Sequence, residues 1–151
     1  MKLLTFLVCD DIRMELGQKH SVIGVYDDRI AFRVAPDRQN SWPKLMKIGF
    51  FMKIILEEEI PNSMVFKITL NGKHTTFFPE RPVNMNRENP KKLLTAALVH
   101  NHFKFTEPGE MQFRIEFYNA DKQLIEALHP ELTLQITEEV VQLPPGFQMQ
   151  Q

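Results

Sequence analysis

The longest alternating run of apolar residues lies between Pro43 and Leu56. Because successive side chains of a β-strand point to opposite faces, this pattern predicts one long strand with a face that is buried along its whole length. At about 3.3 Å per residue such a strand crosses a whole sheet, and we expect it to bend near Gly49. The apolar residues of the buried face are Met46, Ile48, Phe50, Met52, Ile54 and Leu56.

Several shorter segments have the composition of strands that pair with this one. The clearest is a hairpin over residues 65–78, in which two alternating runs flank Asn71-Gly72, a pair typical of tight β-turns. Residues 93–102 are ambiguous between helix and strand, and we favour a strand. Other strands are expected over residues 3–9, 21–26, 29–34, 111–118, 123–128 and 132–136.

Acidic pairs separate some of these strands. We expect Asp10 or Asp11 to cap a single helical turn over residues 12–15, with Gly17 ending it at a positive φ. Asp27 and Asp28 suit a tight turn into the next strand. Residues 79–90, which are rich in proline and asparagine, suit a connection that crosses from one sheet to the other.

About eight or nine short strands without a clear long helix predict an all-β fold. We expect a two-sheet antiparallel β-sandwich, immunoglobulin-like or C2-like. Residues 1–139 are expected to form a single domain, and residues 140–151 a flexible tail. A chain of 151 residues is near the usual size of one domain.

Charge and cysteine content narrow the partners and the compartment. A formal net charge of -1 gives no long-range field for phosphate backbones or anionic lipids, so nucleic-acid and membrane roles are disfavoured. The single cysteine favours a reducing compartment, and no apolar run approaches the roughly 20 residues of a membrane-spanning helix. We therefore expect a cytoplasmic protein.

Two arrangements suggest a metal site. Acidic loops at one end of a sandwich can bind Ca²⁺, yet strand length places the two Asp pairs at opposite ends of a sheet. His100 and His102 are two residues apart, so on a regular strand they share a face, and His74 is a conceivable third ligand. Capping, turn formation and solvent exposure explain these residues without a metal, so we expect no cofactor.

No arrangement of residues in the sequence indicates enzyme activity. Cys9 is the only thiol, and its apolar strand and two neighbouring carboxylates are expected to raise its pKa, which favours a packing role. The glycines are isolated and form no phosphate-binding loop, and no serine lies in a hydrolase-type elbow. We favour a non-enzymatic protein over an enzyme.

Basic and aromatic residues interleave on the second face of the long strand. Lys47, Phe51 and Lys53 share that face, and such a surface can bind single-stranded nucleic acid by stacking and charge. Because the chain is slightly acidic overall, cover by a second sheet or by a partner protein is the favoured interpretation. We expect Phe51 and Lys53 to be exposed residues of a protein-binding face.

The segment from Cys9 to Tyr26 carries a recognisable pattern. Cys9-Asp10-Asp11-Ile12-Arg13, followed by Glu15, Gly17, Lys19 and then Ser21-Val22-Ile23-Gly24-Val25-Tyr26, resembles the N-terminal signature of an uncharacterised bacterial protein family. Residues 106–110 with Phe113-Arg114 resemble a later part of the same family. The resemblance implies a compact bacterial sandwich with no assigned activity, and it carries over no catalytic residues.

These observations lead to one functional hypothesis and one alternative. The first is a sandwich that binds another protein or associates with itself, through a sheet face or an exposed edge strand. Its candidate residues are Asp11, Arg13, Lys47, Phe51 and Lys53, the first two because Arg13 is near enough to pair with either Asp10 or Asp11. The alternative is a metal- or small-ligand-binding sandwich that uses the acidic loops or the paired histidines.

Overall fold

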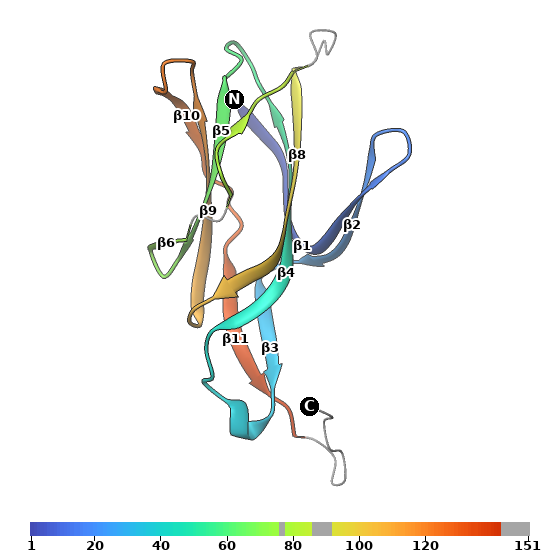
Figure 1. Ribbon diagram of the computed structural model, residues 1–151, viewed down its shortest axis with the longest axis vertical. Coiled ribbons are helices and arrows are strands. Elements are labelled where there is room, and N and C mark those ends of the chain that lie inside the picture. Colours follow the sequence, from blue (N-terminus) through green and yellow to red (C-terminus); the bar gives the residue numbers. More distant parts are fainter. Residues whose placement is uncertain (76–77, 86–91, 143–151) are drawn as a thin grey trace.

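Two β-sheets pack face to face around an apolar core in the computed structural model, which describes residues 1–75, 78–85 and 92–142 (Figure 1). The four-stranded sheet has the order β2 (Lys19–Tyr26), β1 (Lys2–Glu15), β4 (Lys44–Ile55), β8 (Leu93–Phe105). The seven-stranded sheet has the order β3 (Arg29–Val34), β11 (Leu134–Val140), β9 (Gly109–Tyr118), β5 (Ser63–Leu70), β6 (Lys73–Thr75). In that sheet β10 (Leu124–Leu128) also pairs with β9, and β7 (Arg81–Pro82) with β5.

The predicted fold class, an all-β sandwich, is confirmed. The described residues form eleven strands, rather more than expected, because short pieces such as β7 add to the seven-stranded sheet. Their only helical segment is the 3-10 turn Pro36–Arg38, inside the loop that precedes β4. Among the described residues no helix is both long enough and apolar enough to cross a membrane.

Strand β4 is one of the two inner strands of the four-stranded sheet, and it is the long strand that the alternation predicts. It pairs with β1 on one side and with β8 on the other, both antiparallel. Its core-facing residues Ile48, Phe50, Met52 and Ile54 are fully buried. The ring of Phe50 contacts rings from the opposite sheet, with centroid distances of 5.0 Å to Phe66 and 5.9 Å to Phe113. Aromatic packing therefore joins the two sheets.

The ambiguous segment is strand β8, and a bulge explains its irregular pattern. Ile48 of β4 lies opposite His100, whereas Met46 lies opposite Phe103, so β8 holds an extra residue between these pairs. An extra residue reverses which positions face the core. Leu98 is buried before the bulge and Phe103 after it, which breaks the strict alternation.

The Asn71-Gly72 hairpin and the sheet crossing are also as predicted. Both residues have positive φ values, 52° and 75°, and Leu70 pairs with Lys73 across the turn. The chain then passes from β7 in the seven-stranded sheet to β8 in the four-stranded sheet. Residues 76–77 and 86–91 of these expected elements lie outside the described residues, as do residues 143–151 of the expected tail.

One pairing departs from the antiparallel pattern. Strands β3 and β11 pair in parallel, with Ile30 opposite Ile136. Asp27 and Asp28 carry the chain from β2 in one sheet to β3 in the other, so the two strands that they join do not pair. Lys44 of β4 ties the sheets together near this pair through an ion pair of 2.7 Å with Glu138 of β11.

The helical turn predicted over residues 12–15 is wrong. Strand β1 continues through these residues to Glu15 and pairs with β2 down to the Glu15–Lys19 pair. Gly17 does have a positive φ, 76°, but it lies in the loop of a hairpin. A lone helical turn fixes several residues for few hydrogen bonds, whereas pairing with β2 continues a ladder that is already formed in the sheet.

Candidate functional site

The outer half of the β1–β2 hairpin, residues 10–24, leaves the sandwich and is called the arm below. The pairing between β1 and β4 ends at Cys9 and Gly49, and beyond that point β1 pairs only with β2 (Figure 1). Figure 1 shows the arm projecting to the side of the two packed sheets. Its tip exposes apolar side chains: Leu16 is 96% exposed and Met14 77% exposed.

A glycine allows the arm to leave the sheet. Gly24 lies opposite Asp10 with a φ of +66°, and a Cβ atom there would overlap the Asp10 carboxylate. The hydroxyl of Tyr26 donates a hydrogen bond to the same carboxylate. Burial raises the pKa of Tyr26, and the bond to Asp10 raises it further. Asp10 therefore fixes the geometry of the bend.

An ion-pair cluster fastens the base of the arm to β4. The carboxylate of Asp11 contacts Lys47 Nζ at 2.6 Å and Arg13 Nε at 3.4 Å. The hydrogen bond from Lys47 is the main reason that the pKa of Asp11 is lowered. Three of the predicted binding residues thus lie together, with the Asp11 carboxylate shared between two cations.

The base of the arm also lies close to the backbone of β4. A Cβ atom at Gly49 would be 3.0 Å from Cys9 Sγ and 3.1 Å from Ile12 Cγ1. The register shift between Met46 and Ile48 comes from the extra residue in β8, so the bend expected near Gly49 stays a prediction. Gly49 therefore permits the close approach of the arm.

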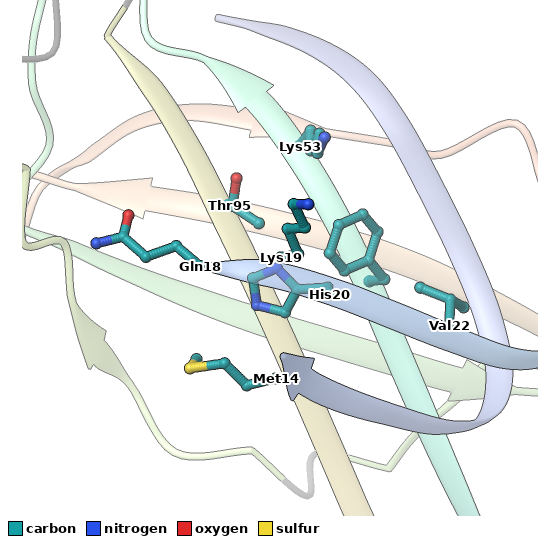
Figure 2. Close-up of a pocket in the computed structure, with 8 residues that line it drawn as sticks. Met14, Gln18, Lys19, His20, Val22, Lys53 and Thr95 are labelled. Carbon is teal, nitrogen blue, oxygen red and sulfur yellow. The ribbon is translucent and has the colours of Figure 1, made fainter. Parts of the chain in front are cut away.

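An open cleft of about 880 Å³ lies between the arm and the outer face of the four-stranded sheet (Figure 2). The sheet contributes Phe51 and Lys53 from β4 and Thr95 from β8. On the arm, Met14 and His20 pair across the two strands, so their side chains lie on the same face of the hairpin. The arm contributes Met14, Gln18, Lys19, His20 and Val22.

The expectation that Phe51 is exposed is wrong, because the arm covers it. Phe51 is only 7% exposed, and the His20 ring lies over it at a centroid distance of 5.4 Å. Lys53 is half-buried, with its Nζ 5.8 Å from the centroid of the Phe51 ring. Phe51 and Lys53 thus line the cleft. The sequence had indicated no partner for His20, since nothing local shows that the hairpin folds back.

The paired histidines do not form the face expected of metal ligands. The ring of His100 packs against Phe78 and Phe103, at centroid distances of 6.0 and 5.8 Å, and its Nδ1 accepts the backbone N–H of His102. The bulge in β8 lies between His100 and Phe103, so the strand is not regular at His102, and His74 is on β6 in the other sheet. In the part of the chain that the structure describes, no group of three or more His, Cys, Asp or Glu side chains is placed to hold a metal ion.

Cys9 has the packing role predicted for it. It is fully buried beside Gly49. Burial, followed by the charges of Asp10 and Asp11, raises the pKa of the thiol to about 11. A thiol in that state is a poor nucleophile at neutral pH.

A second charged cluster lies on the seven-stranded sheet. The Glu116 carboxylate is 2.8 Å from both Lys67 Nζ and Arg114 Nε, and it accepts a hydrogen bond from the Tyr118 hydroxyl. Burial acts to raise the pKa of Glu116, but the bonds from Lys67 and Tyr118 and the charge of Arg114 outweigh it, so the pKa is lowered. In this cluster both cations have the Glu116 carboxylate as a partner, whereas the lysines of the cleft have no such ion pair among the described residues.

Comparison with known proteins adds no relative. A scan against protein-family models and a search of curated protein sequences both gave no match. The resemblance of residues 9–26 to an uncharacterised bacterial family therefore stays a prediction. Those residues are the ones that form the arm and its base.

Proposed function

We propose that this chain is a non-enzymatic sandwich that binds another protein, or a second copy of itself, through the arm. The observation that carries the proposal is the exposure of Leu16 and Met14 at the arm tip, 96% and 77%. Apolar side chains held in solvent on a projecting hairpin suit contact with a partner surface. Sequence resemblance and the single Cys9 support a bacterial, cytoplasmic setting for this role.

The anchoring of the arm supports the same role. The Asp11–Lys47 ion pair and the Asp10–Tyr26 hydrogen bond hold its base against the sandwich. A hairpin fixed at its base loses less conformational freedom on binding than a loose loop does. The arm is therefore preorganised for contact with a partner.

The test compares two variants by their mass in solution and by the proteins that co-purify from the source cell. Met14→Ser combined with Leu16→Ser removes the apolar tip. Leu124→Ser is the matched control, because Leu124 is 48% exposed on β10 in the other sheet. We expect the arm variant to lose the partner or the dimer, and the control to keep it.

Two results would contradict the proposal. One is a wild-type protein that is a monomer and purifies without a partner. The other is a partner or dimer that the arm variant retains, or that the control variant loses to the same extent.

A further inference from the structure

The two lysines of the cleft differ from most other lysines of the chain in their charge environment. Among the described residues, neither Lys19 nor Lys53 has a carboxylate within ion-pair distance, although Lys53 contacts the ring of Phe51. The lysines that do have such a partner are Lys44, Lys47, Lys67, Lys73 and Lys122. The cleft therefore brings together two lysines that form no ion pair among the described residues, although Glu15 lies opposite Lys19 across β1 and β2.

The cleft lining contains no acidic side chain. Its polar groups besides the lysines are Gln18, His20 and Thr95, all neutral or basic. The chain as a whole has a formal charge of -1, so this positive potential is local to the cleft. A local field of this kind favours an anionic ligand at short range and steers its approach.

The aromatic floor argues against nucleic acid as that ligand. Base stacking needs a free aromatic face, but Phe51 is 7% exposed under the His20 ring. The remaining apolar surface comes from Met14 and Val22 on the arm. These side chains suit an aliphatic group of a peptide better than the face of a base.

We propose that the cleft beneath the arm binds an acidic peptide segment of a partner protein. Carboxylates of the segment pair with Lys19 and Lys53, and an apolar side chain of the segment packs between Met14 and Val22. This inference rests on the proposed function and names the chemistry of the partner. Exposed lysine–carboxylate pairs are individually weak, so the selectivity comes from the two charges acting with the apolar contact.

The test uses two short fluorescent peptides, one alternating glutamate and leucine and one with glutamine in place of glutamate, and a short oligothymidylate. The variant is Lys19→Glu combined with Lys53→Glu. The matched control is Lys2→Glu combined with Lys104→Glu, which makes the same change in net charge at lysines outside the cleft that also have no carboxylate partner among the described residues. Binding is measured by fluorescence anisotropy at low and high salt.

We expect the wild type to bind the glutamate peptide, with affinity falling as salt rises, and to bind the glutamine peptide at least about tenfold more weakly. The cleft variant should lose at least about tenfold in affinity, and the control should lose little. Lys19→Gln alone keeps the test valid if the double variant is unstable, since Lys19 is exposed and glutamine places no like charge opposite Glu15 across β1 and β2.

Three outcomes would overturn the inference: no binding of the glutamate peptide, equal loss in the cleft and control variants, or cleft-dependent binding of oligothymidylate instead. The proposed function is tested separately at the arm tip. If Leu16→Ser alone, which leaves the cleft lining unchanged, removes the partner while charge reversal in the cleft does not, the proposed function stands and this inference fails.

Discussion

The sandwich core and the arm share strand β1, yet they differ in the exposure of its apolar side chains. Val8 in the core is fully buried, whereas Met14 in the arm is mostly exposed. The change follows the end of β1–β4 pairing at Cys9, where β1 leaves the cover of its neighbours. Burial thus stabilises one part of the strand, whereas the apolar side chains of the other part lie in solvent. Four variants test this division.

Phe50→Ala should have the largest effect on stability. The Phe50 side chain is fully buried and contacts rings from both sheets, so its removal leaves a cavity at their junction. We expect a loss of about 3–5 kcal/mol in the free energy of unfolding, measured by urea denaturation. Phe50→Leu, which keeps most of the volume, should lose less. If Phe50→Ala lowered the free energy of unfolding by less than about 1 kcal/mol, Phe50 would not be at the centre of the core.

Gly24→Ala should have the next largest effect, because it strains the bend at the base of the arm. The positive φ and the overlap with Asp10 together predict a loss of about 1–3 kcal/mol. Gly17→Ala is the control, since Gly17 also has a positive φ but lies in open space, and it should lose about 1 kcal/mol. Adding Asp10→Ala should restore part of the Gly24→Ala loss. Equal losses at the two glycines would contradict a steric role for Asp10.

Glu116→Gln should have a smaller effect that depends on pH. The folded-state pKa of Glu116 lies below its ordinary value of 4.5, so its contribution to stability is complete above that value and is lost as pH falls through the folded-state pKa. We expect the variant to lose about 1–2 kcal/mol at neutral pH and to approach the wild type in acid. Glu131→Gln, at an exposed position, should follow the wild type at every pH. Parallel curves for Glu116→Gln and the wild type would contradict this role.

Met14→Ser combined with Leu16→Ser should have the smallest effect on stability. Both side chains are mostly in solvent, so the free energy of unfolding should change by no more than about 0.5 kcal/mol. The same urea denaturation measures it. A loss of more than about 1 kcal/mol would mean that the tip contributes to the fold, and the division between core and arm would then be wrong.

Local patterns were sufficient to predict the elements that depend on near neighbours. Alternation identified β4, and Asn71-Gly72 identified the β5–β6 hairpin. The reading of β8 stayed ambiguous because its bulge reverses the buried face between Leu98 and Phe103. The helical turn over residues 12–15 was wrong because the carboxylates of Asp10 and Asp11 bond to Tyr26 and Lys47, and neither caps a helix.

The candidate site was predictable only in its parts. Asp11, Arg13 and Lys47 do come together, and Phe51 and Lys53 do share a face. What local sequence does not encode is the direction in which the arm folds. Because the arm folds back over the sheet, His20 covers Phe51 and a cleft forms. The presence of Lys19 and Lys53 in the same cleft therefore follows from tertiary structure alone.

The parallel pairing of β3 with β11 has a consequence for the rate of folding. The two strands are separated by about 100 residues, so their contact closes a long loop and carries a large entropic cost. The β1–β2 hairpin, in contrast, closes over only a few residues at Gly17. Contacts between distant segments slow folding, and local ones form quickly. The hairpin is therefore expected to form early, and the docking of β3 beside β11 to be the late, slow step in the assembly of the sandwich.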